Sequence, residues 1–518
     1  MGNPRVRFAP SPTGALHIGG VRTALFNYLF AKANNGTLVL RIEDTDQTRY
    51  VDGAEDYIKE ALRWLGITPD EGPDNQGDYG PYRQSERKYV YRKYVDKLLA
   101  DGNAYYAFDT PEDLEEMRNR LKENRVMNPQ YDTLTRSSMK NSLTLSDEEV
   151  RQRIDAGEPY VIRIKIPEKD EVRLNDLIRG WVRVNTEVMD DKVLMKSDGM
   201  PTYHLANVVD DHLMKITHVI RGEEWLPSTP LHILLYTFFG WEYERPQFAH
   251  LPLILKPDGN GKLSKRAADK AGFPISPLNW EDPKTNEISN GFREEGFLPE
   301  AVLNFLALLG WNPGTEQELF SLDELIQEFK INKINKAGTK FDFEKAKWFN
   351  QQYIKQRDSK FFAEGLIDHL RRVHSIQCPT DVAIQIVDLL KERVTLSHEF
   401  FEKSLVMFKP PQTFDQKIVT KKWSNDAQAA LRLFAEELSI RDEISQKEAK
   451  EVFWSTLESA GYKPRQFMQI LRVALTGEGS GPDLMAMIHI IGPKKAAERI
   501  KNAINLLLKQ NENNESKR

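Results

Sequence analysis

Two short stretches, far apart in the chain, carry residue types that suit the handling of phosphate groups. The first, APSPTGALHIGG at residues 9–20, holds three glycines and one histidine after a strand-like run. Glycines leave the backbone bare, so that N–H groups and a helix N-terminus can approach a phosphate or a base. The second, GKLSKR at residues 261–266, places Lys262 and Lys265 on either side of a serine. A well-aimed lysine can neutralise charge on a leaving pyrophosphate, an effect of roughly 3 kcal/mol.

Each stretch also has a plainer interpretation. The glycines can simply close a tight connection between a strand and a helix, and His17 can pack against that helix or cap it. Lysines in a loop can simply be solvated. Together, the glycine-histidine turn and the lysine loop favour a site for a nucleotide triphosphate, with His17 directed at the phosphates.

The residues around the first stretch have the pattern of a strand-helix-strand unit. Residues 5–9 alternate charged and apolar side chains, residues 16–29 place apolar ones at helical spacing, and Asn35-Gly36 supplies a stop. TLVLRIED, residues 37–44, follows as a second strand. The expected geometry is a right-handed βαβ unit with parallel strands, and its turn lies where such folds bind ligands.

The rest of the chain changes character several times. Charged helices and a Pro-bounded strand indicate an inserted domain over residues 85–200, and residues 217–241 return to a strand, a loop and an apolar helix. Residues 256–295 are rich in Pro, Gly, Asp and Lys, which predicts a mobile loop. From about 300 to 510 the pattern is helical, with a capping sequence at Ser321-x-x-Glu324.

Composition bounds the class of protein. The 518 residues are enough for about two to four domains. No apolar run of about 18 residues is present, and the first residues lack the apolar stretch of a signal peptide. The single cysteine, Cys378, excludes an internal disulfide and a thiolate zinc site, so we expect a cytoplasmic protein without membrane contact. The net charge of −5 argues against a generic polyanion binder, although a basic patch can lie within an acidic total.

Taken together, HIGG and KLSKR resemble the two signature sequences of class I aminoacyl-tRNA synthetases. Further stretches resemble glutamyl-tRNA synthetases in particular, namely RFAPSPTGALHIGGVRTALFNYLFA, LRIEDTD, EGPDNQGDYGPYRQSER, LMKSDGMPTYHLANVVDDHLMKITHVIRGEEW and STPLHILLY. The likeness runs from residue 5 to about 350, and more loosely to about 505.

This resemblance implies an α/β fold, with a Rossmann-type class I synthetase catalytic domain that carries an inserted acceptor-binding domain and is followed by an all-α C-terminal anticodon-binding region. The predicted boundaries are 1–84 for the first half of the catalytic domain, 85–200 for the inserted acceptor-stem-binding domain, 201–265 for the second half with the KLSKR loop, 266–358 for a stem-contact region and 359–518 for the helical anticodon-binding domain.

The resemblance implies two steps. L-glutamate attacks the α-phosphate of ATP with the assistance of Mg²⁺, which gives glutamyl-adenylate and pyrophosphate, and the glutamyl group then passes to the 3′-terminal adenosine of tRNA(Glu) for protein synthesis. Both reactants of the first step are anions, so catalysis is mostly positioning and charge stabilisation. His17, Lys262 and Lys265 are the implied catalytic residues. The implied ATP-binding residues are His17, Gly19, Gly20, Lys262, Ser264 and Lys265.

An acidic amino acid calls for arginine, because a guanidinium binds a carboxylate with two hydrogen bonds and does not titrate. The resemblance assigns this task to Arg7 and Arg221, and the ligand's ammonium group to Glu43. Ala9, Ser11, Tyr203 and Asn207 are the implied neutral contacts. Without the motifs, Arg7 would be an ordinary strand residue and Glu43 a loop cap. The acidic EDTD run also suits a metal, but the resemblance makes it an amino-acid-binding loop, so no protein-ligated metal is expected.

The chain departs from the family pattern at two places. Some members carry a cysteine zinc site in the inserted domain, but residues 85–200 contain no cysteine, so no zinc is expected. The stretch at residues 267–291 is longer than usual, and it can either extend the lysine loop or pack on its base.

Contacts with tRNA are implied at three places. Residues 330–360 contain nine Lys and Arg against three Asp and Glu, with aromatic side chains between them, a pattern that suits phosphate contacts or an amphipathic helix. The inserted domain, with GPYRQSER and residues 118–125, is expected to hold the acceptor end. Arg393 matches the arginine that reads the last anticodon base in enzymes that charge only tRNA(Glu), although it can equally be a solvated side chain. A monomer is the family expectation.

Several alternatives stay open. A non-discriminating enzyme would also charge tRNA(Gln). A glutaminyl-tRNA synthetase would carry β-barrels where this chain has helical periodicity, and the truncated relatives that modify a tRNA base lack an anticodon domain. A catalytically inactive tRNA-binding module would be expected to have lost His17, Lys265 or Arg7, all of which are present.

Overall fold

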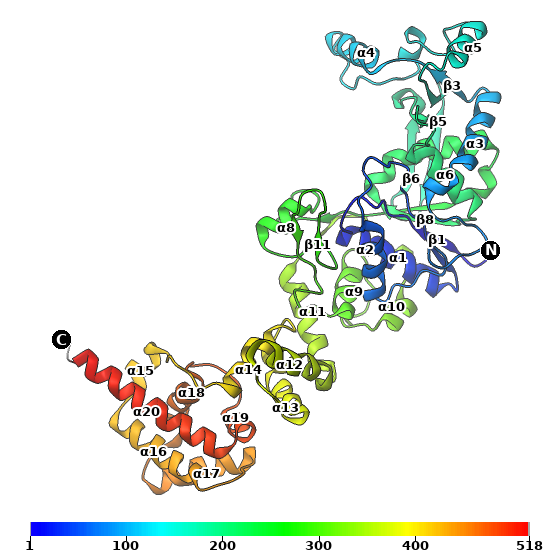
Figure 1. The fold of residues 1–518 in the computed structure, drawn as a ribbon. Helices are drawn as coiled ribbons and strands as arrows, with labels where there is room; N and C mark the ends of the chain where they lie inside the picture. Colours follow the sequence, from blue (N-terminus) through cyan, green and yellow to red (C-terminus); the bar gives the residue numbers. More distant parts are fainter. Residues whose placement is uncertain (1, 516–518) are drawn as a thin grey trace. The chain divides into compact units, whose positions relative to one another are not determined.

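The computed structural model describes residues 2–515, which form two compact units. The first unit comprises the residues up to 294 together with 299–346, and the second comprises 295–298 and the residues from 347 onward. Figure 1 shows the first unit in blue to light green and the second in yellow to red. None of the helices within residues 2–515 combines the length and the apolar character needed to cross a bilayer.

The chain opens with the predicted βαβ unit. Strand β1 (Arg5–Phe8) is followed by helix α1 (Ile18–Ala33) and by strand β2 (Thr37–Leu40). The two strands are parallel, with Val6 opposite Leu38, and both of these side chains are buried. The parallel geometry predicted from the sequence is therefore confirmed.

A second parallel pair of strands lies beside the first. Strand β8 (His218–Gly222) leads through helix α7 (Thr229–Phe239) into strand β9 (Gln247–Leu251), in register with β8. The amide of Thr217 donates to the carbonyl of Arg5 at 2.9 Å, which joins the two pairs. The carboxyl ends of β1 and β8 therefore open at the same edge, where open α/β folds bind their ligands.

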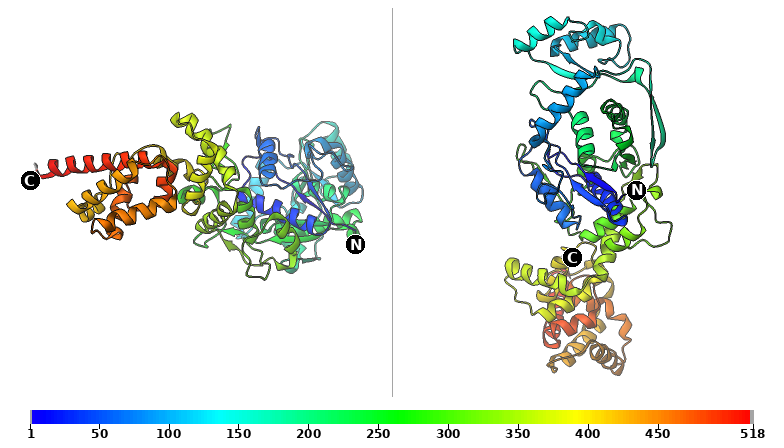
Figure 2. Two further views of the ribbon diagram at one scale, coloured as in Figure 1. Left: turned by 90° about the horizontal axis from the view of Figure 1, so that it is seen from below. Right: turned by 90° about the vertical axis from the view of Figure 1, so that its right-hand side faces the viewer.

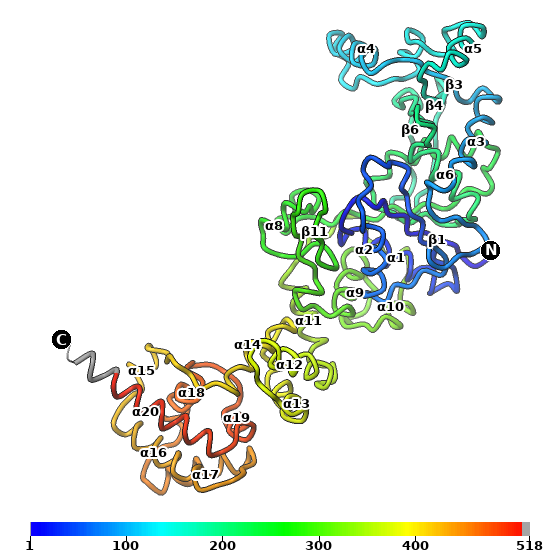
Figure 3. The backbone as a smooth tube through the Cα atoms, viewed as in Figure 1, coloured from blue at the N-terminus to red at the C-terminus, as the bar shows by residue number. Residues whose placement is uncertain are grey.

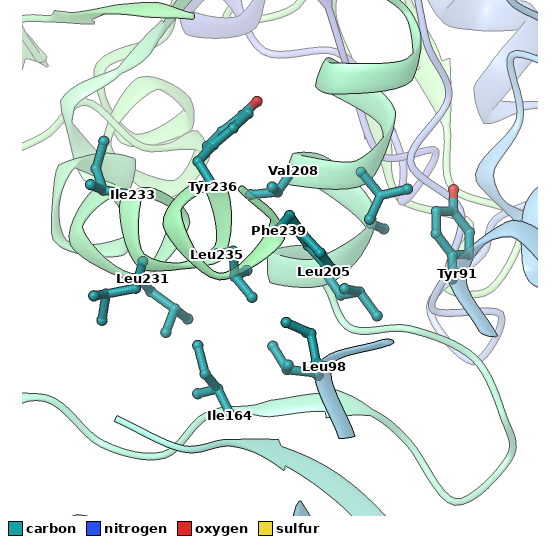
Figure 4. Packing of buried hydrophobic residues seen from close by; sticks show 14 of the residues in the cluster. Tyr91, Leu98, Ile164, Leu205, Val208, Leu231, Ile233, Leu235, Tyr236 and Phe239 are labelled. Atoms are coloured by element: carbon teal, nitrogen blue, oxygen red, sulfur yellow. The ribbon is translucent and has the colours of Figure 1, made fainter. Parts of the chain in front are cut away.

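Apolar helices pack beneath these strands and form the main core of the first unit. Helices α3 (Lys88–Ala100) and α6 (Tyr203–Leu213) pack on each other and on α7. Figure 4 shows side chains of this core converging from α3, α6, α7 and the strand β4 (Val161–Ile164), including Leu98, Ile164, Leu205, Leu235 and Phe239. Helix α2 (Ala54–Trp64) lies earlier in the chain, after β2.

The region predicted as an insertion forms its own small sheet. Strands β3 (Ala104–Ala107), β4 (Val161–Ile164) and β7 (Val193–Met195) pair antiparallel in the order β3-β4-β7, and β5 (Glu171–Asp176) pairs with β6 (Gly180–Asn185) as a two-stranded ribbon. Helices α4 (Pro111–Glu123) and α5 (Asp147–Asp155) both begin with capping boxes. Figure 3 shows α4 and α5 at the end of the first unit that is remote from α9 (Pro299–Leu308) and α10 (Leu322–Glu328).

The tract at residues 256–295 is more ordered than its composition predicts. Helix α8 (Lys265–Ala271) begins within the KLSKR sequence, and β11 (Trp280–Glu281) pairs with β12 (Ile288–Ser289) as a short hairpin. The prediction of a loop is therefore wrong for residues 265–271 and for the hairpin. The buried side chains of Ala268 in α8 and of Leu263 just before it attach this part to the unit. A further short parallel pair joins β10 (Ile254–Leu255) to β13 (Thr339–Lys340), and only β13 lies within the region predicted as helical.

The second unit is all-helical, as predicted. Its helices are α11 (Phe343–Gln356, which begins in the first unit), α12 (Ser359–His374), α13 (Thr380–Leu390), α14 (Glu399–Phe408), α15 (Gln416–Lys422), α16 (Asn425–Ser439), α17 (Gln446–Ser459), α18 (Met468–Thr476), α19 (Leu484–Ile491) and α20 (Pro493–Glu515). Helix α20 packs along α16 and α18, and Figure 2 shows it in red beside the orange helices. The capping box predicted at Ser321 and Glu324 starts α10 in the first unit.

Replacing Leu235 by alanine is expected to destabilise the first unit by about 3 kcal/mol, because the side chain is fully buried in the main core and its loss leaves a cavity. The measurement is urea unfolding followed by circular dichroism. Leu134→Ala is the matched control, since Leu134 is 80% exposed and should change stability little. Equal losses in both variants would contradict the packing described here.

Candidate active site

A cavity of about 670 Å³ lies in the first unit at the carboxyl ends of β1 and β8. Four separate segments of the chain meet there, within residues 7–23, 203–207, 221–225 and 252–264, together with Glu43 after β2 and Ile58 of α2. The cavity brings together the predicted residues Arg7, Ala9, Ser11, His17, Gly19, Gly20, Glu43, Tyr203, Asn207, Arg221, Lys262 and Ser264. Lys265 follows Ser264 in the chain but does not itself line the cavity.

The glycine-histidine turn forms the start of α1. His17 is the N-cap residue, and its Nδ1 accepts the amide hydrogen of Gly19 at 2.9 Å. At Gly20 an added Cβ would lie 2.7 Å from the Leu16 Cδ1, so the leucine side chain would have to shift to admit it. Burial and, second, the charge of Lys262 lower the pKa of His17 to about 4, so the imidazole is neutral near pH 7. The capping role considered for His17 is therefore real, and the residue also faces the cavity.

Both signature lysines are ion-paired. The Lys262 Nζ lies 2.7 Å from Glu224 Oε1, and the Lys265 Nζ lies 3.4 Å from Glu287 Oε2. The backbone between them is fixed, because the amide of Leu263 donates to the carbonyl of Ile254 at 2.8 Å. All four charged groups are 40% exposed or more, and ion pairs with that exposure contribute about 0–1 kcal/mol. The lysine side chains can therefore change partners at low cost, although their backbone is held.

The long stretch at residues 267–291 packs on the base of the site instead of extending the loop. The carbonyl of Ile275 accepts the amide hydrogen of Ile18, the first residue of α1, at 2.9 Å. The hydroxyl of Tyr57 in α2 donates to the carbonyl of Leu278 at 2.7 Å, and the ring of Trp280 contacts Tyr57 edge-on. The stretch thus joins α8 to the starts of both helices that border the turn.

The two predicted arginines have different surroundings. Arg7 is 3% exposed, and its Nε donates to Asp211 at 3.1 Å; its two terminal nitrogens have no hydrogen-bond partner among residues 2–515. Arg221 is 4% exposed, and its nitrogens donate to uncharged acceptors, namely His250, Tyr203, Thr229 and the carbonyl of Trp225. Within the described part of the chain, no carboxylate lies at ion-pair distance from Arg221. A buried guanidinium without a counter-ion at the wall of a cavity marks a place for an anion.

A buried network of charges behind the cavity was not predicted. Arg41 is fully buried and donates to Asp211 at 2.7 Å and to Glu43 at 3.0 Å. Arg87 donates to Asp210 at 2.7 Å. The sequence held one signal for this network, since the acidic pair of VVDDHL interrupts an apolar helical pattern. The side chains come from β1, from the residues after β2, from the 3₁₀ turn Gln84–Arg87 and from α6, so their pairing could not be read from spacing.

Glu43 is part of this network and also lines the cavity. Its Oε1 accepts from Asn207 Nδ2 at 3.1 Å as well as from Arg41. Burial raises the pKa of Glu43, while the charges of Arg41 and Arg7 oppose that rise. The carboxylate is thus presented to the cavity by partners that also hold it in place.

Comparisons with known proteins agree with this geometry. Residues 4–348 match the family model for the catalytic domain of class I tRNA synthetases (E and Q), and residues 344–504 match a model for an anticodon binding domain. The glutamate–tRNA ligase of Cytophaga hutchinsonii is 56% identical over 505 residues, 96% of this chain and 97% of that protein, and that of Parabacteroides distasonis is 53% identical over 97% and 99%. The chain belongs to the glutamate–tRNA ligase family.

Solved structures of the family have the same fold. A glutamate–tRNA ligase from Elizabethkingia meningosepticum, crystallised in complex with its amino acid, matches with a TM-score of 0.94 and 48% identity over 98% of this chain and all of that one. The enzyme from Elizabethkingia anophelis matches with a TM-score of 0.92 and 48% identity over 97% of this chain and all of that one. The two family models meet at residues 344–348, where the two compact units also divide.

In this glutamate–tRNA ligase fold the acids of the EDTD run have partners within the protein. Asp44 accepts from the amide and hydroxyl of Ser85 at 2.8 and 2.6 Å, and Asp46 accepts from Thr48 and Arg49. Among residues 2–515 no cluster of three or more His, Cys, Asp or Glu side chains suits a metal ion.

Arg393 lies in the second unit, at the end of the 3₁₀ turn Lys391–Arg393, and is exposed. It stands close to Arg472, whose pKa is lowered first by burial and then by the charge of Arg393. Within the basic segment at residues 330–360, helix α11 has the two faces of an amphipathic helix, with Phe349 buried and Trp348 39% exposed.

The stability of the first unit is expected to depend on pH through His17. Its pKa of about 4 in the folded chain lies below the ordinary value of 6.5, so the unfolded chain takes up the proton first as the pH falls. The free energy of unfolding should therefore decrease by up to about 3 kcal/mol as the pH falls from 6.5 to 4. The stabilisation that His17 contributes should be fully present above pH 7. Urea unfolding at a series of pH values measures it.

His17→Asn is the matched variant for this measurement. Asparagine keeps a side-chain acceptor for the helix N-terminus but does not titrate in this range. Its unfolding free energy should change less between pH 6.5 and 4 than that of the parent chain. The same pH dependence in both proteins would show that the low pKa of His17 is not its source.

Proposed function

We propose that this chain activates L-glutamate with ATP and transfers the glutamyl group to the 3′-terminal adenosine of tRNA(Glu). Membership of the glutamate–tRNA ligase family supports the reaction, and the cavity at the ends of β1 and β8 supports the binding of both small substrates. The residue roles that follow are part of this proposal.

The observation that carries the proposal is the buried, unpaired charge of Arg221 beside the free terminal nitrogens of Arg7. The three arginines Arg7, Arg41 and Arg87 are balanced by Asp210, Asp211 and Glu43. Arg221 pairs with none of these acids. The side-chain carboxylate of glutamate would supply the missing charge, whereas the neutral carboxamide of glutamine would not.

The rest of the glutamate molecule has partners nearby. The carboxylate of Glu43 would receive the ammonium group, since it borders the cavity and is held by Asn207 and Arg41. The neutral contacts are assigned to Ala9, Ser11, Tyr203 and Asn207, which line the same wall. This placement leaves the α-carboxylate directed at the glycine-histidine turn.

ATP is assigned to the other part of the cavity. The neutral His17 would donate to phosphate oxygens, and Gly19 and Gly20 leave room for the adenosine. Ser264, Lys262 and Lys265 would hold the triphosphate. An oxygen of the glutamate α-carboxylate then forms a bond to the α-phosphorus while the bond to the bridging oxygen breaks, and pyrophosphate leaves with that electron pair. Mg²⁺ would arrive with ATP, held by its phosphates without a protein ligand.

A second cavity, of about 240 Å³, adjoins the first and shares Ser11, Glu43 and Tyr203 with it. We assign it to the terminal adenosine of the tRNA, whose ribose hydroxyl must reach the activated carbonyl.

The remaining tRNA contacts are assigned by region. These are the insertion at 85–200 for the acceptor stem, 266–358 for the stem contact and 359–518 with Arg393 for the anticodon. We propose a cytoplasmic monomer.

The proposal is tested by pyrophosphate exchange with ATP and total tRNA, followed by charging of purified tRNA(Glu) and tRNA(Gln) side by side. Glutamate should support exchange and glutamine should not. Equal charging of the two tRNAs would establish the non-discriminating alternative, and no exchange with any amino acid would leave only a tRNA-binding role.

Arg221→Gln should lower kcat/KM for glutamate by on the order of 100-fold or more, because a buried charged contact to the substrate is lost. Arg63→Gln is the matched control, since Arg63 is an exposed residue of α2 that does not line the cavity. An unchanged kcat/KM in the Arg221 variant would remove this residue from the glutamate site.

Lys265→Ala should slow adenylate formation by about 100-fold with little change in glutamate affinity, because its charge acts on the developing pyrophosphate. Pyrophosphate-exchange kinetics at several glutamate concentrations separate the two effects. Lys270→Ala, at an exposed position of the same helix α8, should leave both unchanged. A change confined to the KM for glutamate would contradict the role given to Lys265.

A further inference from the structure

A chain of three buried side chains leads from the turn of the β5–β6 ribbon to the proposed glutamate site. The Asp176 Oδ2 lies 2.6 Å from His250 Nδ1, and the Arg221 Nε donates to His250 Nε2 at 3.0 Å. Asp176 and His250 are 2% and 0% exposed. Neither residue lines the cavity, and neither was singled out from the sequence.

The chemistry of arginine decides which nitrogen of His250 carries the proton. A guanidinium only donates, so His250 Nε2 must be an unprotonated acceptor. The single proton of the neutral ring is then on Nδ1, from which it is donated to the Asp176 carboxylate. The backbone amides of Ile178 and Arg179 also donate to this carboxylate, at 2.9 and 2.8 Å, and orient it.

We propose that Asp176 and His250 are positioning residues for recognition of the glutamate side chain. Asp176 fixes the tautomer of His250, and His250 holds the guanidinium of Arg221 by its Nε. The terminal nitrogens of Arg221 are thereby set beside Tyr203 and Thr229, at the wall of the cavity. This inference rests on the proposed function, since it assigns a task to residues behind the same substrate.

An uncharged acceptor has a specific advantage at this position. A carboxylate in place of His250 would orient Arg221 equally well, but it would also neutralise the guanidinium and weaken its attraction for the substrate. Arg7 shows that other arrangement, because its Nε is bound directly by Asp211. The histidine satisfies the donor and leaves the charge of Arg221 available to the ligand.

The neutral state of His250 follows from its surroundings. Burial lowers its pKa, the hydrogen bond with Asp176 opposes this, and the charge of Arg221 lowers it further. The titratable and charged groups that face His250 are Asp176 from β5, Arg179 from the β5–β6 turn, Arg221 from β8 and His232 from α7. Protonation would place a second donor against Arg221 Nε, so recognition of glutamate should fail when the ring is charged.

Two amide variants of His250 separate its two hydrogen bonds. His250→Asn places its amide near the former Nδ1, so it keeps the contact with Asp176 but leaves Arg221 Nε without an acceptor. His250→Gln reaches the former Nε2 and can still accept from Arg221. We expect the KM for glutamate to rise about 10- to 100-fold in His250→Asn and clearly less in His250→Gln, with the KM for ATP unchanged in both. Steady-state pyrophosphate exchange provides these constants.

Asp176→Asn and His218→Asn complete the experiment. Asp176→Asn can accept from or donate to the ring, so the tautomer is no longer fixed and the KM for glutamate should rise. His218→Asn, at the opposite end of β8, should not change it. The pH profile of the glutamate KM gives a further readout. In the parent chain, protonation of His250 at low pH should raise the KM for glutamate, and this rise should be absent in His250→Gln.

The outcomes distinguish this inference from the function on which it rests. If the parent chain shows no glutamate-dependent exchange, the proposed function fails. If the parent chain is active and His250→Asn retains the parent's KM for glutamate, the positioning role is overturned. It is also overturned if His250→Asn and His250→Gln raise the KM for ATP as much as the KM for glutamate. Melting temperatures of all variants identify a loss that comes from unfolding alone.

Discussion

The first unit depends on a network of buried charges behind the wall of its cavity. Arg41, with no exposed surface, is shared between Asp211 and Glu43, and the neighbouring Asp210 is held by Arg87. Removing one partner of such a pair leaves an uncompensated charge in the interior, which lowers the free energy of unfolding by about 3–5 kcal/mol. Because the partners come from the residues after β2, from a 3₁₀ turn and from α6, the network ties these elements together.

This network also holds side chains at the wall of the cavity. Arg7, Glu43 and Asn207 are each held by a buried partner and face the place assigned to glutamate. Arg221 belongs to the same wall but is held by neutral groups, so its charge is not cancelled inside the protein. In the proposed function, the division between paired and unpaired arginines would make the pocket selective for an acidic ligand.

The lysine loop at the cavity is built differently. Lys262 and Lys265 are held by exposed carboxylates, in contacts that a triphosphate can replace, while the backbone beneath them is fixed by Leu263 and by helix α8. The segment at residues 267–291 connects this helix to the start of α1 through Ile275. In the proposed function, the lysine side chains would exchange these partners for the phosphates of ATP while the backbone beneath them stays in place.

The sequence by itself determined the features that depend on neighbouring residues. The parallel βαβ unit follows from periodicity around residues 5–44, and His17 and Lys262 were found because each lies within a contiguous motif. Only the tertiary structure decided that residues 265–271 form a helix and not a loop, and that Asp176 reaches His250 across 74 positions of the chain. The physical reason is that backbone preferences are local, whereas burial and ion pairing depend on which distant side chains the fold brings together.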